Sequence, residues 1–254
     1  MSLEIRNASL KLGDKVLLGN FSARFAPGEL TIILGPNGTG KSSLLKLLSL
    51  EWPTEAELFY FGKPANQWKA QELAASMGVL PQSSTLTFAF TVREVVELGG
   101  LTLTASQREI SAIASEKMAQ TDVLHLADRL YPSLSGGEKQ RVHLARVLTQ
   151  LAKSAVPPIL MLDEPTSALD IAHQHRTLAL AKQLATEGSA VIAVIHDLNL
   201  AAQYADKIIM LNGGKIAAQG SPEDVLKAST INEVYGWPVQ IIPHPIHNHP
   251  VVVG

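Results

Sequence analysis

The sequence has 254 residues, of which 46% are hydrophobic and 17% are charged. This balance excludes an intrinsically disordered chain and is typical of a globular protein with a sizeable core. Lysine and arginine number 21 against 23 aspartate and glutamate residues, a formal net charge of −2 without a basic block, so we expect no nucleic acid partner.

The absence of cysteine excludes disulfides and thiol chemistry. No apolar run approaches the roughly 20 residues that span a bilayer, and the N-terminal residues do not form a secretory signal. We therefore expect a cytosolic chain.

The first elements predicted are two strands, at residues 3–10 and 16–25, where apolar and polar positions alternate. Gly13 and Asp14 lie between them, so an antiparallel pair is expected. Pro27 and Gly28 then turn the chain into an apolar strand at residues 30–34.

A glycine-rich loop follows this strand and precedes a helical run. It consists of Gly35, Pro36, Asn37, Gly38, Thr39, Gly40, Lys41, Ser42 and Ser43. The pattern G-x-x-x-x-G-K-S between a strand and a helix is that of a phosphate-binding loop, in which backbone N–H groups surround an anion. Lys41 is expected to reach the β- and γ-phosphates, and the Ser42 hydroxyl to ligate Mg²⁺. The alternative is a plain glycine-rich turn, which the complete pattern disfavours.

The next elements are a helix that stops before Pro53, a short strand at 58–61, a helix at 66–76 and an apolar run at 78–80 that ends at Pro81 and Gln82. Residues 91–151 carry no strand signal. Helical spacing occurs instead at 92–98, 110–118 and 138–151, which suggests an inserted helical subdomain.

A second possible anion site opens the last of these helices. It is formed by Leu134, Ser135, Gly136, Gly137 and Glu138. A serine and two glycines at a helix start favour either an anion-binding terminus or a simple N-cap with a flexible approach. Spacing alone leaves both possibilities open.

Strands resume at 159–162, 190–195 and 207–211, with helices at 171–185 and 198–204 between them, so an α/β fold with a parallel sheet is expected. Gly213 and Gly214 predict a hairpin to one more strand. Two carboxylates, Asp163 and Glu164, end the first of these strands. Asp163 could hold Mg²⁺ and Glu164 could deprotonate a water molecule, whereas helix-capping acids are the alternative.

Taken together, these motifs resemble those of an ABC transporter ATP-binding subunit. The matching set is 35–43 (Walker A), Gln82 (Q-loop), 134–140 (signature motif), 159–164 (Walker B), Ser167, Ala168, Leu169 and Asp170 (D-loop), and His196 (switch histidine). The resemblance implies a P-loop NTPase with a RecA-like core and an antiparallel β subdomain in 1–90 and 152–254, a helical subdomain in 91–151, and a proline- and histidine-rich tail in 240–254.

The same resemblance assigns roles to these residues. Glu164, His196 and Gln82 would be catalytic, and Ser42, Gln82 and Asp163 would serve Mg²⁺. It also implies a homodimer in which Ser135, Gly136 and Gly137 of one chain hold the γ-phosphate of ATP bound to the other chain, while Asp170 touches the partner's site.

The family's adenine-stacking aromatic is missing near Leu12, although Phe21 and Phe25 lie on the following strand. Residues 83–92 are expected to form an apolar loop that could receive a helix of a membrane permease. The alternative is that Phe88 and Phe90 close the core of the helical subdomain, and a third possibility is that one packs inward while the other faces the partner. The tail histidines His244, His247 and His249 could bind a metal or haem iron, but a loosely packed surface tail is favoured because no carboxylate or cysteine completes a site.

Two further histidines, His173 and His175, are two apart on a helix and should not share a face.

Within the family, the chain most resembles importers of haem. The resemblance implies a peripheral ATPase on the cytoplasmic face of the bacterial inner membrane, working with a permease dimer and a periplasmic haem-binding protein. A ferric siderophore or vitamin B12 importer is the alternative. A non-transport ABC protein is disfavoured because the chain lacks a tandem ATP domain or long coiled coil, and a scaffold without turnover because Glu164 and His196 are both present.

Overall fold

The computed structural model describes residues 2–12, 15–82 and 88–254. Its strands are β1 (Leu3–Leu12), β2 (Lys15–Phe25), β3 (Glu29–Leu34), β4 (Glu57–Tyr60), β5 (Lys63–Pro64), β6 (Met77–Leu80), β7 (Ile159–Asp163), β8 (Ala190–Val194), β9 (Lys207–Asn212), β10 (Lys215–Gly220), β11 (Gln240–Pro243) and β12 (Pro250–Val253). Its α-helices are α1 (Lys41–Leu48), α2 (Ala70–Ala74), α3 (Val92–Glu97), α4 (Gln107–Gln120), α5 (Gly136–Leu151), α6 (Ile171–Thr186), α7 (Leu198–Tyr204), α8 (Pro222–Val225) and α9 (Ala228–Tyr235). Short 3₁₀ helices occur at η1 (Ala65–Gln67), η2 (Leu98–Thr102), η3 (Leu124–Leu126) and η4 (Tyr131–Ser133).

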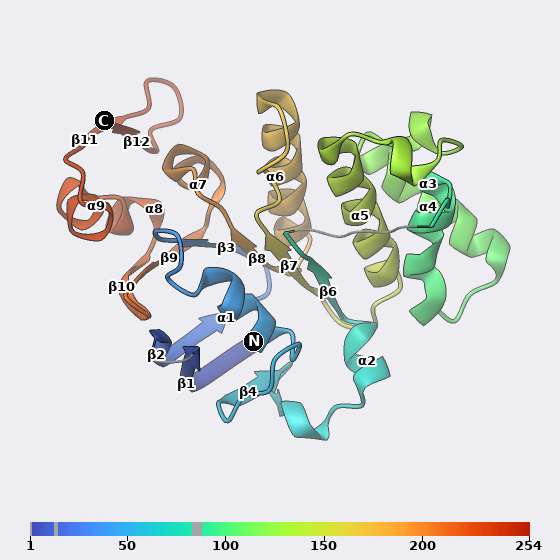
Figure 1. Ribbon diagram of the computed structural model, residues 1–254, viewed down its shortest axis with the longest axis horizontal. Coiled ribbons are helices and arrows are strands. Elements are labelled where there is room, and N and C mark those ends of the chain that lie inside the picture. The colour runs from blue at the N-terminus through green and yellow to red at the C-terminus, as the bar shows by residue number, and fades with distance from the viewer. Residues whose placement is uncertain (1, 13–14, 83–87) are drawn as a thin grey trace.

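A six-stranded sheet forms the centre of the described molecule, in the order β10-β9-β3-β8-β7-β6. All its neighbouring pairs are parallel except β10 with β9, which form a hairpin. The predicted parallel sheet and the hairpin at Gly213 and Gly214 are confirmed. A second sheet, β2-β1-β4-β5, is antiparallel and lies on the side of α1 away from the central sheet (Figure 1).

Alternate residues of β3 bury opposite faces of the central sheet. Leu30 and Ile32 belong to an apolar cluster with α5, α6 and α7, whereas Ile33 packs with α1 and the antiparallel sheet. This period of two is what a strand covered on both faces requires. The layers therefore run antiparallel sheet, α1, central sheet and covering helices (Figure 1).

A third apolar cluster lies within the helices of residues 92–151, at one end of the molecule (Figure 1). Helix α5 joins this cluster to the rest, because Val142 and Ala145 belong to it while Leu144 and Leu148 belong to the cluster on the central sheet. Thus one helix packs into both parts.

The predicted helix at 66–76 is wrong in extent, since only η1 and the five-residue α2 form there. Trp68 interrupts the run with extended backbone angles, donates a hydrogen bond to the Tyr60 carbonyl at 3.2 Å and packs edge-on against Phe61. Burial of the indole against the antiparallel sheet outweighs local helix preference.

The tail is also more ordered than expected. Strands β11 and β12 pair antiparallel, and the Asn199 side chain of α7 forms hydrogen bonds with both backbone groups of Val252. The rings of His244, His247 and His249 stack near the hairpin's loop. In the described part of the chain, no group of three or more His, Asp or Glu residues is arranged to hold a metal ion.

Candidate functional site

The glycine-rich loop connects β3 to α1 with backbone angles that favour glycine. Gly35 has φ +145° and Gly40, which caps α1, has φ +95°. A Cβ on Gly35 would lie 2.3 Å from the Leu211 carbonyl oxygen, and one on Gly40 would lie 2.5 Å from that of Leu17. Any side chain at these two positions would therefore displace the loop from the strands on which it rests.

Lys41, the first residue of α1, folds back over this loop. Its buried Nζ donates hydrogen bonds to the carbonyls of Gly35 (2.7 Å) and Pro36 (2.9 Å). Burial lowers the pKa of Lys41, and the negative charges of Glu164 and Asp163 oppose that shift. A cationic donor thus lies at the loop, where an anion held by the backbone N–H groups of α1 would meet it.

Ser42 and Asp163 meet beside the loop, although they are far apart in the sequence. The Ser42 hydroxyl donates a hydrogen bond to Asp163 Oδ1 at 3.0 Å. Burial raises the pKa of Asp163, and the neighbouring Glu164 adds to the rise, while the Ser42 hydrogen bond and the charges of Lys46 and Lys41 oppose it. A hydroxyl and a carboxylate are the hard oxygen donors that Mg²⁺ prefers, so this pair fits a magnesium ion. Gln82 follows β6, the neighbour of β7 in the sheet, with its side chain exposed at the same edge.

Glu164 has a different partner from Asp163. Its Oε1 lies 2.7 Å from His196 Nε2, which comes from the end of β8. The backbone of Glu164 is left-handed, with φ +50°. Four hydrogen bonds hold it: its N–H donates to the Val194 carbonyl (3.0 Å), and its own carbonyl accepts from Gln140 Nε2 (2.8 Å) and from the Oγ (3.1 Å) and N–H (3.2 Å) of Ser167. The carboxylate and the imidazole therefore stand together at a fixed place, suited to orienting and deprotonating water.

The second glycine motif begins α5 with a capping box. Ser135 Oγ accepts a hydrogen bond from the Glu138 N–H, while Glu138 Oε2 accepts from the N–H (2.7 Å) and the hydroxyl (2.8 Å) of Ser135. These hydrogen bonds lower the pKa of Glu138. The predicted N-cap is therefore present, and among the described residues no hydrogen bond joins it to the glycine-rich loop of β3 and α1.

Residues 167–170 lie directly against this motif. A Cβ on Gly137 would come 2.8 Å from the Ala168 carbonyl, so the two backbones touch. Asp170 caps α6 by accepting from the His173 N–H at 2.9 Å. Together these segments line a hollow of about 260 Å³ that also includes Arg141 and His173.

Other predictions have mixed outcomes. Phe21 and Phe25 are only 1% exposed, so neither is available to stack on a base, which corrects that alternative. Phe88 is 68% exposed, whereas Phe90 packs against the small helical cluster, as anticipated for that pair. The remaining loop residues 83–87, like Gly13 and Asp14, lie outside the described residues.

Sequence reasoning assigned no role to Gln140, Arg141 or Asp122, whose side chains also connect these segments. Gln140 lies within the signature motif and Arg141 directly follows it. No local sequence pattern indicates that Gln140 contacts Glu164 or that Arg141 contacts Asp122. His173 and His175 diverge as expected, the first toward Asp170 and the second toward Tyr204 on α7.

Comparison with known proteins places this geometry in a family. A family profile described as "ABC transporter" matches residues 18–167. The "Hemin import ATP-binding protein HmuV" of Photobacterium damselae subsp. damselae is 54% identical over 255 residues, covering 100% of this chain and 96% of that protein. A protein of the same name from Vibrio vulnificus (strain YJ016) is 55% identical, covering 97% and 95%.

Among solved structures, the dimeric structure of a bacterial ABC transporter cassette matches with a TM-score of 0.76 and 26% identity. The match covers 87% of this chain and 98% of that one. The described residues include no helix that is both long and apolar enough to cross a bilayer. With its phosphate loop, paired carboxylates and second glycine motif in one α/β fold, the chain belongs to the ABC transporter family, as an ATP-binding subunit with ATPase activity.

Proposed function

We propose that this chain hydrolyses ATP to drive haem import through a separate membrane permease. The choice of haem as substrate rests on one observation. Over nearly the whole chain, more than half of the residues are identical to those of proteins named for hemin import. No residue of the described site is expected to touch haem, so the cargo follows from kinship and the ATPase role from the site.

The phosphate loop and Lys41 bind the triphosphate in this proposal. Backbone N–H groups of the loop at residues 35–43, which Pro36 lacks, surround the phosphates, and Lys41 exchanges its two carbonyl partners for phosphate oxygens. Ser42, Asp163 and Gln82 would hold Mg²⁺, which neutralises phosphate charge when bound. Asp163 must be ionised for this role. Burial raises its pKa, and the Ser42 hydrogen bond and the charges of Lys46 and Lys41 oppose that rise.

Glu164 acts as general base in this proposal. Its carboxylate lies beside His196, so a water molecule between them and the γ-phosphate could be oriented by the imidazole and lose its proton to Glu164. The left-handed backbone at Glu164 aims this carboxylate away from Asp163, which remains committed to the metal. Because Asp163 serves the metal ion and Glu164 serves the water molecule, the ion does not compete for the general base.

We further propose that two chains share each site. Ser135, Gly136 and Gly137 have no hydrogen bond to their own phosphate loop within the described structure, which leaves them available to ATP bound by a partner. The similarity to a dimeric cassette supports this arrangement. Residues 167–170, packed against Gly137, would meet the partner at the same boundary.

The permease dimer is proposed to dock near the exposed Phe88, on the cytoplasmic face of the inner membrane, with a periplasmic haem-binding protein delivering cargo. Reconstitution of the chain with its permease and binding protein tests the substrate. Haem-loaded binding protein should stimulate ATP hydrolysis, whereas a Glu164→Gln complex should show no stimulation. Stimulation by a ferric siderophore or vitamin B12, but not by haem, would refute haem and favour the alternative.

A further inference from the structure

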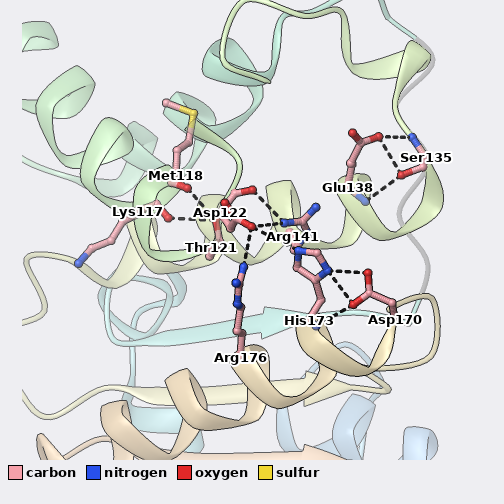
Figure 2. Close-up of polar contacts among 10 residues, drawn as sticks. All are labelled: Lys117, Met118, Thr121, Asp122, Ser135, Glu138, Arg141, Asp170, His173 and Arg176. Atoms are coloured by element: carbon pink, nitrogen blue, oxygen red, sulfur yellow. Dashed lines mark hydrogen bonds and ion pairs between the residues drawn. The ribbon is translucent and has the colours of Figure 1, made fainter. Parts of the chain in front are cut away.

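A polar cluster lies beside the signature motif, and apart from Asp170 its residues have no part in the function proposed above. Its centre is Asp122, whose Oδ2 lies 3.0 Å from Arg176 Nη1, 3.3 Å from Arg141 Nη1 and 3.3 Å from His173 Nε2 (Figure 2). The other ring nitrogen of His173, Nδ1, lies 2.9 Å from both carboxylate oxygens of Asp170. These five residues are called the Asp122 junction below.

The chain presents Asp122 by a tight end to α4. Thr121 Oγ1 donates to the Lys117 carbonyl at 3.0 Å, and Asp122 then takes a left-handed φ of +56° (Figure 2). Aspartate tolerates this conformation better than most residues. The turn sends the carboxylate across to α6, where His173 and Arg176 lie on successive turns.

Both carboxylates of the junction are held in the ionised form. Burial would raise the pKa of Asp122, but the hydrogen bond from His173 and the charges of Arg141, Arg176 and His125 outweigh it, so the pKa is lowered. The backbone and side-chain hydrogen bonds of His173 lower the pKa of Asp170. The two ring nitrogens of His173 therefore contact two carboxylates that belong to different parts of the molecule.

The junction fixes the end of α5 that carries the signature motif. The C-terminal half of α5 is anchored by apolar packing of Leu144 and Leu148 against the cluster on the central sheet. Near its N-terminal end, Arg141 donates to the Asp122 carbonyl at 2.9 Å and to its carboxylate. Asp122 is in turn tied to α6, which begins where the D-loop ends.

We propose that His173, by bridging Asp170 to Asp122, is a positioning residue that sets the orientation of the signature helix relative to the D-loop. Both segments meet the partner's nucleotide, so this inference rests on the shared site of the proposed function. The junction makes them move as one unit. A chain without the bridge keeps its own phosphate loop but presents a misaligned surface to its partner.

His173→Leu and Asp122→Asn test this role in the full chain. Asparagine preserves the left-handed turn while removing the charge that Arg141, Arg176 and His173 contact. In a Glu164→Gln background, we expect each variant to weaken ATP-driven dimerisation roughly tenfold, within the range of coupling between contacting charged groups. The affinity of the monomer for ATP, measured at chain concentrations too low for dimerisation, should be unchanged. Glu116→Gln is the matched control, because it removes an exposed ion pair with Lys117 that stays within α4.

A distance measurement separates positioning from a general loss of structure. The chain has no cysteine, so spin labels can be placed at Ala112→Cys on α4 and Ala179→Cys on α6, both exposed. His173→Leu should shift or broaden the distance distribution between the labels, and Glu116→Gln should not.

Unchanged distances and unchanged dimerisation in both junction variants would overturn the positioning role. A loss of ATP affinity by the monomer would also overturn it, because the residues would then support the fold as a whole. If the Glu164→Gln parent itself stays monomeric with ATP, the shared site fails. The distance between the two labels then still tests the positioning role of the Asp122 junction, because both labels lie in one chain and no dimer is needed.

Discussion

A buried histidine in the signature helix should make the helical part of the molecule sensitive to acid. His143 on α5 is 3% exposed, and its Nε2 lies 2.7 Å from the Tyr131 hydroxyl. Its Nδ1 is buried with no hydrogen-bond partner among the described residues. Burial, together with the nearby positive charge of Arg146, lowers the pKa of His143 from 6.5 to about 4.

The sign and size of the effect follow from this pKa. The unfolded chain binds a proton near pH 6.5, whereas the folded chain resists it until about pH 4. Stability from the neutral imidazole is therefore complete above pH 6.5 and is lost as the pH falls toward 4. The full loss amounts to about 3 kcal/mol, a large part of the roughly 5–15 kcal/mol that stabilises a typical domain.

Urea unfolding from pH 4 to pH 7, followed for wild type and His143→Gln, measures this contribution. Glutamine can still bond the Tyr131 hydroxyl but does not titrate, so groups common to both proteins cancel in the difference. His175→Gln, from a second His–Tyr pair near the surface, controls for the loss of a histidine as such. Parallel stability curves for wild type and His143→Gln between pH 4 and 6.5 would refute the reasoning.

Four further outcomes are expected. Lys41→Ala should weaken ATP binding by about one to two orders of magnitude, the usual worth of a charged hydrogen bond, and unchanged affinity in calorimetry would argue against the phosphate loop. Glu164→Gln should cut hydrolysis at least about 100-fold while ATP binding persists, and gel filtration with ATP should show a dimer rather than a monomer. Ser135→Arg should bind ATP normally yet lose turnover, so normal turnover would count against a shared site. Gly35→Ala should cost about 1–3 kcal/mol of stability in thermal unfolding, because its Cβ meets a backbone carbonyl. Gly62→Ala, with φ +80° but open space, should cost less, and equal losses would exclude the clash.

The elements that hold the phosphate loop could be predicted because their signals are local. The expected strands at 30–34 and 159–162 match β3 (Glu29–Leu34) and β7 (Ile159–Asp163) within one residue at each end. Short apolar runs of that length, bounded by Gly35 or by a pair of carboxylates, are typical of buried strands. Parallel order then brings their carboxyl ends to one edge, and Ser42 meets Asp163 there.

Contacts between distant segments could not be predicted in the same way. The tail pairs as a hairpin because Asn199, some 50 residues earlier, binds both backbone groups of Val252. The two strands, Gln240–Pro243 and Pro250–Val253, do not alternate apolar and polar residues, so they give no local strand signal. Likewise the helix expected at 66–76 gave way to Trp68, whose partners lie on another strand. In both cases tertiary contacts overrode local preference.

The direction of the Glu164 side chain is the clearest case of a property that only the assembled fold determines. A left-handed backbone at a residue other than glycine costs on the order of 1–3 kcal/mol, so the local sequence alone disfavours it. The compensating contacts come from β8 through Val194, from α5 through Gln140 and from Ser167. Because Gln140 lies in the helix that begins with the signature motif, the backbone of the proposed base is tied to the segment that faces a partner's nucleotide. The two ends of α5 are thus held by different interactions. The C-terminal half is fixed by apolar packing, which hydrophobic spacing predicts, whereas the N-terminal half is fixed by polar contacts, which hydrophobic spacing cannot reveal.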